Sequence, residues 1–387
     1  MSKKLLAACL FSTIFCFSAI NYEVYLESWD SCGDVSFWQN AMEGLPSING
    51  NPSYQGVTLN ISFAAFLFDD SPHLQGFQFS NTNTQSEVDA SINQIVSYVH
   101  GQGGKVKVSF GGASYAYPFA PNYFISQTTA DGGWPNNIQY LADGVIASVQ
   151  YYGLDGVDFD IEDPQPASSS KEEFAAQLIT FLQAVRTGLP TSIISITIPG
   201  QGWNSYWQNL AQSVGTSAGL VDYISFMEYD IGVSGTYPDQ IVSDIKTYTS
   251  TQDEYLPTNY SPGWNIPISL VQLGLMGGSD DLGNILTTSA AESLTSVAAD
   301  EGLYGVMFWD LDRDAGTTPN DCQPEVPPTD ADPYAFSNAI RQAILAPTPI
   351  ENFSSYLPAV RKTNTMQKAL IKYPPPPHGA PPTQPSS

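Results

Sequence analysis

Residues 155–162 read DGVDFDIE, a stretch in which apolar and acidic residues alternate. Side chains that alternate along a β-strand point to its opposite faces. The apolar residues therefore share one face, suited to packing beneath helices, whereas Asp158, Asp160 and Glu162 share the other. As a strand, this stretch lines up three carboxyl groups on one side of the backbone.

These three acids fit poorly on a solvated strand face. A strand that belongs to a series of alternating strands and helices is covered on both sides, so the acids lie in the interior or in a cleft. Unpaired carboxylates are costly there. Desolvation and mutual repulsion force at least one of them to keep its proton. A carboxylic acid that stays protonated near neutral pH is what cleavage of a glycosidic bond requires.

Strand-like and helical patterns alternate through the rest of the chain. Eight segments read as strands: Tyr22–Trp29, Gly56–Phe68, Lys105–Phe110, Asp155–Ile161, Ser192–Ile198, Val221–Tyr229, Ile268–Leu275 and Leu303–Asp310. Eight is the number that a closed (β/α)8 barrel needs, so we expect an α/β fold of the TIM-barrel type. Pattern alone also supports an open, doubly wound sheet.

Helix-start signals accompany the helical segments. Ser170 with Glu173 has the spacing of a capping box, and so does Ser289 with Glu292 before the last strand. Tyr334–Leu345 has the pattern of a final helix. These signals predict helices that begin just after residues 170 and 289.

The charge balance excludes some classes of partner. The chain carries 38 Asp and Glu against 13 Lys and Arg, a formal net charge of −25. Phosphate binding needs clustered basic residues, so nucleic acid is excluded as a partner. The acidity is typical of a soluble exported protein. With three His and no metal-ligand spacing among the four Cys, we expect no metal and no cofactor.

The two ends of the chain differ from its body. Residues 1–19 read as a secretory signal, in which Lys3 and Lys4 precede an apolar run that is too short to span a membrane. We therefore expect a secreted protein, extracellular or periplasmic, with no membrane span. Residues 346–387 are rich in proline and serine and read as a disordered tail. A single barrel domain is expected over residues 20–345.

Four short motifs, in order along the chain, resemble those of glycoside hydrolase family 18, the family of many chitinases. Residues 155–162 resemble its DxxDxDxE signature, and residues 109–112, SFGG, resemble its SxGG motif. Residues 227–230, MEYD, resemble its MxYD motif. Trp309 stands where the family has a tryptophan at the end of its eighth strand. Each motif alone is weak, but the four together span most of residues 22–345.

The resemblance implies a substrate-assisted reaction, in which the acetamido oxygen of the substrate is the nucleophile. Glu162 would protonate the leaving oxygen and then activate water. Asp160 would orient the acetamido N–H and balance positive charge. Asp158 would share a proton with Asp160, and Tyr229 would hold the acetyl group from the other side.

The same resemblance implies a set of substrate-binding residues: Trp309 as an apolar floor, with Met227, Asp230, Gly111 and Gly112 around it. Sugar rings stack on aromatic side chains, and seven other aromatic residues lie near the carboxyl ends of the predicted strands. We expect about half of these to face the groove: Trp29, Tyr115, Tyr117, Phe119, Trp203, Trp207 and Trp264.

Cleavage of the signal leaves two cysteines, Cys32 and Cys322. In an exported chain such a pair is a disulfide candidate. Cys32 follows the first predicted strand and Cys322 follows the eighth. In a closed barrel these strands are neighbours and both loops lie at the carboxyl-terminal face, so we expect the two cysteines to be bonded.

Three functions fit the predicted site. The first is a chitinase acting on chitin or N-acetylglucosamine oligomers, and the second is an endo-β-N-acetylglucosaminidase acting on N-glycans. The third is a non-catalytic chitin-binding lectin, although such lectins usually lose the acid that stands here as Glu162. Leu275 and Leu303 are separated by only enough chain for a loop and one helix. We therefore expect no α+β insertion between strands seven and eight, an open groove and endo-type cleavage. The protein is separately expected to be a monomer.

Overall fold

The structure is a computed structural model. It describes residues 20–29, 37–66, 68, 71–79, 83–115, 133–162, 170–200, 205–233, 235–251, 263–316 and 332–345. Cys32, Cys322, the expected signal over residues 1–19 and the expected tail over residues 346–387 lie outside these ranges. The disulfide, the signal and the tail therefore stay predictions.

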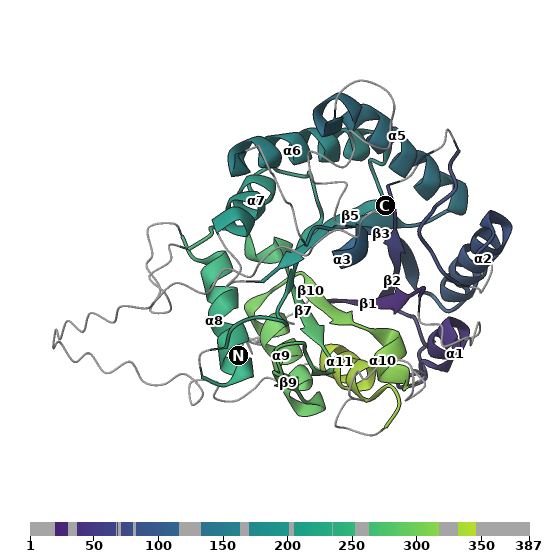
Figure 1. Cartoon of the computed structure of the whole chain (residues 1–387). Coiled ribbons are helices and arrows are strands. Elements are labelled where there is room, and N and C mark those ends of the chain that lie inside the picture. Colours follow the sequence, from purple (N-terminus) through teal and green to yellow (C-terminus); the bar gives the residue numbers. More distant parts are fainter. Residues whose placement is uncertain are drawn as a thin grey trace, which may run out of the picture. The chain divides into compact units, whose positions relative to one another are not determined.

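Eight parallel strands close into a barrel in the order β1-β10-β7-β6-β5-β4-β3-β2 (Figure 1). They are β1 (Asn21–Glu27), β2 (Val57–Ala64), β3 (Lys105–Gly111), β4 (Gly156–Asp160), β5 (Ile193–Pro199), β6 (Tyr223–Met227), β7 (Val271–Met276) and β10 (Gly305–Trp309). The first and last strands pair directly, with Asn21 beside Gly305 and Val24 beside Phe308. This pairing closes the sheet, which confirms the TIM barrel and excludes the open sheet.

Helices surround the strands on the outside of the barrel (Figure 1). The longer ones are α1 (Phe37–Gly44), α2 (Gln85–Gly101), α5 (Gly133–Tyr152), α6 (Lys171–Gly188), α7 (Ser205–Gly215), α8 (Tyr237–Thr249), α9 (Thr288–Glu301) and α11 (Ala335–Leu345). Short helices α3 (Gly112–Tyr115) and α10 (Leu311–Ala315) follow β3 and β10, and a 3-10 turn, η2 (Ile268–Leu270), precedes β7. No helix among the described residues is long and apolar enough to cross a membrane.

One of the two predicted helix starts is confirmed and the other is wrong. The Ser170 side chain accepts a hydrogen bond from the Glu173 N–H and caps α6 as expected. At α9 the cap is Thr287 instead of Ser289, because the Thr287 hydroxyl accepts from the Ala290 N–H. A threonine two residues earlier meets the same capping requirement, so the helix begins sooner than the capping-box spacing indicates.

The two faces of β4 separate as the alternation predicts. On the outer face, the Phe159 ring packs against Phe110 of β3 and Phe181 of α6, at centroid distances of 6.3 and 5.0 Å. On the inner face, Asp158 lies beside Ser109 of β3 and Ser195 of β5 in the strand register. The outer face is therefore apolar core, and the acids point into the barrel.

The segment between β7 and β10 is short. It holds a two-stranded hairpin, β8 (Gly278–Ser279) with β9 (Ile285–Leu286), and then α9. All of residues 263–316 are described, and no insertion domain occurs among them. The expected absence of an α+β insertion is confirmed, and a small hairpin stands where the sequence predicts a loop.

Candidate active site

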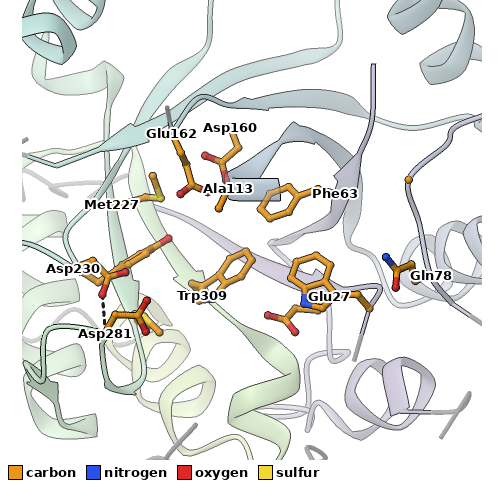
Figure 2. A pocket seen from close by; sticks show the side chains of 14 residues that line it. Glu27, Phe63, Gln78, Ala113, Asp160, Glu162, Met227, Asp230, Asp281 and Trp309 are labelled. Carbon is orange, nitrogen blue, oxygen red and sulfur yellow. Dashed lines mark hydrogen bonds between the residues drawn. The ribbon is translucent and has the colours of Figure 1, made fainter. Parts of the chain in front are cut away.

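A cavity of about 460 Å³ contacts the residues at the carboxyl ends of the strands (Figure 2). Its lining residues are Glu27, Trp29, Phe63, Gly76, Gln78, Ala113, Asp160, Glu162, Met227, Tyr229, Asp230, Met276, Asp281 and Trp309. Seven residues singled out from the sequence are among them: Trp29, Asp160, Glu162, Met227, Tyr229, Asp230 and Trp309. Strands β4, β6 and β10 thus bring the predicted acids, the tyrosine and the tryptophan to one cavity.

Glu162 lies two residues beyond the end of β4, with its carboxyl group in the cavity (Figure 2). Burial raises the pKa of Glu162 to about 7, against an opposing effect of the Ala113 N–H, which donates a hydrogen bond to its carboxyl group. A carboxyl group with a pKa of about 7 is largely protonated in weakly acidic solution. Glu162 can therefore donate a proton and take one back.

Asp160 is almost completely buried beneath the cavity, with 2% of its surface exposed. Burial raises the pKa of Asp160 well above its usual range, and the nearby Glu162 and Asp158 raise it further. Its Oδ1 atom is buried without a hydrogen-bond partner among the described residues. An unpaired buried oxygen of this kind is costly unless a ligand completes its hydrogen bonding.

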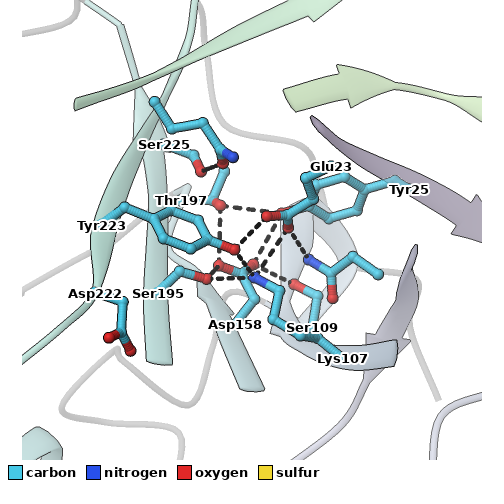
Figure 3. Close-up of polar contacts among 12 residues, drawn as sticks. Glu23, Tyr25, Lys107, Ser109, Asp158, Ser195, Thr197, Asp222, Tyr223 and Ser225 are labelled. Carbon is cyan, nitrogen blue, oxygen red and sulfur yellow. Dashed lines mark hydrogen bonds and ion pairs between the residues drawn. The ribbon is translucent and has the colours of Figure 1, made fainter. Parts of the chain in front are cut away.

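Asp158 lies deeper and does not contact the cavity. Its Oδ2 accepts hydrogen bonds from the hydroxyls of Tyr25 and Ser109 at 2.8 and 2.7 Å (Figure 3). Its Oδ1 accepts from Ser195 and Thr197 at 2.6 and 3.1 Å. Four hydroxyl donors from β1, β3 and β5 converge on this one carboxyl group, so its position beneath Asp160 is fixed.

Tyr229 and Asp230 follow the end of β6. Burial raises the pKa of Tyr229 well above its usual range, so its phenol stays a hydrogen-bond donor. Asp230 is bonded reciprocally to the hairpin: its N–H donates to Asp280 at 2.8 Å, and the Asp281 N–H donates to its carboxylate at 2.7 Å (Figure 2). The hairpin therefore fixes the turn that carries both predicted site residues.

Asp280 is the anchor of this hairpin. Besides the Asp230 N–H, it accepts hydrogen bonds from the N–H groups of Leu282 and Asn284 and from the Asn284 side chain, at 2.7–3.1 Å. The same Asn284 side chain donates to the Ile231 carbonyl at 3.1 Å. These bonds join the hairpin to the turn after β6.

Three aromatic rings form one wall of the cavity. The Phe63 ring stacks on Trp309 with a centroid distance of 5.6 Å and an interplanar angle of 13°. It stacks on Trp29 at 5.5 Å and 16°. Phe63 was not predicted from the sequence, whereas Trp29 was one of seven aromatic candidates. The wall is an apolar surface wide enough for a sugar ring to pack against.

Gly111 and Gly112 are not among the lining residues, and their contact with a substrate stays a prediction. The structure gives another reason for glycine at these two positions, namely the lack of space for a side chain. A Cβ atom at Gly111 would lie 2.0 Å from the Asp160 carbonyl oxygen, and one at Gly112 would lie 2.5 Å from the Phe63 ring. Both residues also have positive φ, 119° and 72°. The two glycines allow close packing beside the acids and the aromatic wall.

The expectation for the other aromatic residues is only partly met. Trp207 and Trp264 are buried away from the cavity, and Trp264 packs against Tyr248 at 4.8 Å. Both are therefore core residues. Three further candidates, Tyr117, Phe119 and Trp203, and the side chain of Tyr115 lie outside the described structure.

Two lining residues were missed although the sequence carries a signal for them. Glu27 and Met276 stand at the ends of β1 and β7 on the inward-facing alternation, as Glu162 does after β4. Asp281 is at the tip of the hairpin, which was not predicted. Within the described residues no group of His, Cys, Asp and Glu side chains could hold a metal ion.

Comparison with known proteins gives a consistent match. The profile described as Glycosyl hydrolases family 18 matches residues 24–260. A protein of Enterococcus faecalis named chitinase is 22% identical over 324 residues, which covers 76% of this chain and 82% of that protein. The region matched by the family profile includes part of β1 and all of β2 to β6, and with them Asp158, Asp160, Glu162 and Tyr229.

The fold of this chain resembles those of solved chitinase structures. The chain superposes on a putative chitinase A of Streptomyces coelicolor with a TM-score of 0.54 at 15% identity, covering 84% of this chain and 99% of that one. The catalytic domain of a hyperthermophilic chitinase of Pyrococcus furiosus gives a TM-score of 0.52 at 17% identity, with 83% and 94% covered. At these identities the two matches support the barrel architecture.

Proposed function

This chain belongs to glycosyl hydrolases family 18, and we propose that it is a chitinase that hydrolyses β-1,4 bonds between N-acetylglucosamine units. The observation that carries the proposal is the buried carboxyl group of Glu162, which faces the cavity with a pKa of about 7. A relative that matches 76% of the chain bears the name chitinase.

The first step of the proposed reaction breaks the glycosidic bond. The acetamido oxygen of the bound sugar attacks the anomeric carbon while Glu162 gives its proton to the departing glycosidic oxygen. Asp160, with a free Oδ1 atom, accepts the acetamido N–H and stabilises the oxazolinium ion that forms. The Tyr229 phenol donates to the acetamido group from the other side of the cavity.

The second step restores the enzyme. Water attacks the anomeric carbon of the oxazolinium ion, and Glu162 takes a proton from that water. The bond between the anomeric carbon and the acetamido oxygen breaks, and the acetamido group is regenerated. Two inversions at the same carbon leave the β-configuration unchanged.

We also propose that the enzyme cleaves within chitin chains and is secreted. The support for internal cleavage is the short segment between β7 and β10, where a small hairpin stands in place of an insertion domain. The support for secretion is the signal-like composition of residues 1–19. A non-catalytic lectin is disfavoured because Glu162, Asp160 and Tyr229 are all present in the cavity.

Two substrates test the proposal together. The purified protein is incubated with the hexamer of N-acetylglucosamine and, separately, with a high-mannose glycoprotein, and the products are separated by chromatography. A chitinase releases short oligomers from the hexamer and leaves the glycoprotein intact. If the protein releases the intact N-glycan and leaves the hexamer uncut, it is an endo-β-N-acetylglucosaminidase and the proposed chitinase function is wrong.

A further inference from the structure

A lysine, Lys107, is completely buried inside the barrel, close to Asp158 (Figure 3). The Lys107 ammonium lies 3.0 Å from the Glu23 carboxylate, which is 1% exposed. It also donates to the hydroxyls of Ser195 and Tyr223 at 2.7 and 2.5 Å. An ammonium group is costly to bury unless its three donors are satisfied, and here all three have a partner.

Ser195 connects this ammonium to the acids above it. Its hydroxyl accepts the hydrogen bond from Lys107 and donates its own proton to Oδ1 of Asp158 at 2.6 Å (Figure 3). One hydroxyl group therefore separates the positive charge of Lys107 from the negative charge of Asp158. In a buried site with few waters, a charge at this separation has a strong effect.

Glu23 competes with Asp158 for the same ammonium. It accepts hydrogen bonds from the Asn60 amide at 2.9 Å, from the Tyr223 hydroxyl and from Lys107. Burial raises the pKa of Glu23, the charge of Lys107 lowers it, and the charge of Asp158 raises it. The two carboxylates therefore interact electrostatically: Glu23 is ion-paired with Lys107 directly, and Asp158 is linked to it through the Ser195 hydroxyl.

From these contacts we propose that Lys107 is a positioning residue that orients Asp158 through Ser195 and places a positive charge next to the acids of the cavity. Glu23 limits how much of the lysine charge reaches Asp158. The pair Lys107–Glu23 thereby sets the pH range in which Asp160 and Glu162 hold their protons. The part of this inference that concerns catalysis rests on the proposed chitinase function.

The charged and titratable groups around Asp158 come from four strands. They are Glu23 and Tyr25 of β1, Lys107 of β3, Asp160 of β4 and Tyr223 of β6. The tyrosines stay neutral, because burial raises the pKa of each well above its usual range. Lys107 is thus the cation of a group that also contains three carboxyls.

The direction of the effect follows from these charges. Glu23→Gln removes one negative charge and leaves Lys107 with Asp158 as its charged partner. More positive charge then acts on Asp160 and Glu162, and their pKa values fall. The basic limb of the activity profile, where Glu162 loses its proton, should move to lower pH by at least about half a unit.

The test is a cycle of variants measured by two methods. Glu23→Gln, Lys107→Met and the double variant Glu23→Gln/Lys107→Met are compared with the native protein. The pH profile of kcat/KM is measured on the hexamer of N-acetylglucosamine. The protonated carboxyl band of Asp160, identified by its loss in Asp160→Asn, is followed by infrared spectroscopy as a function of pH. Lys105→Met, which removes an exposed lysine from the same strand, is the matched control.

We expect the downward shift in Glu23→Gln and its disappearance in the double variant, because the shift requires the lysine. Lys105→Met should leave the profile in place. The double variant removes both charges of the ion pair, so it keeps the test valid if Lys107→Met alone does not fold.

Two results would overturn the proposal: no downward shift in Glu23→Gln, or the same shift in the double variant as in Glu23→Gln. If the native protein does not cleave the hexamer, the proposed function fails. The infrared titration of Asp160 then still decides whether Lys107 acts on the acids.

Discussion

The ring of Phe63 lies nearly parallel to the indole of Trp309, with centroids 5.6 Å apart and planes inclined by 13°. Phe63 itself is 6% exposed and belongs to a cluster with Tyr25, Met227 and Tyr229, on which Trp309 packs. The residue that would support the sugar is therefore itself supported by a second ring. Substitutions at the two positions should have different consequences.

Trp309→Ala removes the apolar surface that the sugar would contact. Because burying a large apolar side chain contributes about 1.5–3 kcal/mol, kcat/KM on chitin oligomers should fall about 10- to 100-fold. Phe63→Leu keeps an apolar neighbour but loses the parallel stacking, so a loss of about threefold is expected. The half-exposed Tyr151 on α5 is the control: Tyr151→Ala should behave as the native enzyme. Equal activity of Trp309→Ala and the control would refute a sugar-binding role for Trp309.

Glu162→Gln keeps the shape of the side chain and removes its acidic proton. The Ala113 N–H can donate to the amide oxygen as it does to the carboxyl group, so the melting temperature should change little. We expect kcat on the hexamer to fall by at least about 100-fold, the scale of general-acid catalysis. The exposed Glu292 on α9 gives a matched control, Glu292→Gln, with native activity. Near-native turnover of Glu162→Gln would exclude it as the acid.

The pH profile of the native enzyme should reflect the raised pKa of Glu162. The first step needs the protonated form, so kcat/KM should decline as pH rises through about 7. Activity should be retained in weakly acidic buffer, where Glu162 keeps its proton. The measurement is kcat/KM on the hexamer between pH 4 and 9 at constant ionic strength. A profile still rising above pH 8 would contradict the assignment.

Asp160→Asn and Tyr229→Phe test the role of the acetamido group. Each removes a group that would hold or stabilise the attacking acetamido oxygen, so each should reduce kcat by about 10-fold or more. The native enzyme should release β-anomers first, as seen by proton NMR before mutarotation. It should not cleave oligomers of glucosamine that lack the acetyl group. An α-anomer as the first product would rule out the substrate-assisted route.

A second pair of buried acids, Glu228 and Asp244, lies outside the cavity lining. The Tyr248 hydroxyl donates to Glu228, and the Gln240 amide donates to Asp244 at 2.9 Å. The two carboxyl groups are also hydrogen-bonded to one another. Burial raises the pKa of Asp244 to about 7 and that of Glu228 well above its usual range. Both groups therefore hold protons in the folded state that the unfolded chain releases.

This pair should make stability fall with rising pH. A carboxyl group whose pKa is raised by folding stabilises the fold fully below its unfolded pKa, and this contribution is lost as pH rises through about 7. Asp244→Asn imitates the protonated acid at every pH. Between pH 5 and 8 the native protein should therefore lose roughly 3 kcal/mol of unfolding free energy that the variant keeps. Urea unfolding at the two pH values measures the difference.

The control for this prediction is Asp300→Asn, which changes an exposed aspartate on α9. It should have the same pH dependence as the native protein. If Asp244→Asn also follows the native curve, the raised pKa of Asp244 is not the cause of the pH dependence.

The barrel and the acids of its cavity could be predicted because they depend on local alternation. The pattern in residues 155–162 separates the packing face of β4 from the face that carries Asp158, Asp160 and Glu162. No other strand was needed for that inference. Strand-end positions such as Tyr229 and Trp309 follow the same logic, because in a barrel all strands end at one face.

Phe63 could not be predicted in this way. The register between β2 and β3 shifts between Ile61 and Ala64, and such an irregularity breaks the two-residue alternation on which the prediction depends. The prediction that Trp264 faces the groove is wrong for a different reason. A position near the end of a strand does not determine which residues the ring contacts. Contacts between distant segments, such as Asp280 with Asp230, leave no periodic pattern in the sequence at all.

The hairpin from Gly278 to Leu286 has a consequence for engineering. Its hydrogen bonds to the turn after β6 come from Asp280, the Asp281 N–H and Asn284, whereas the exposed Leu282 follows the cavity-lining Asp281 at the tip. Residues grafted between Asp281 and Leu282 would leave the Asp280 and Asn284 anchors in place. Longer insertions would extend the wall of the cavity while the catalytic residues stay unchanged. Variants of this enzyme would then differ in the length of the polymer segment that they bind.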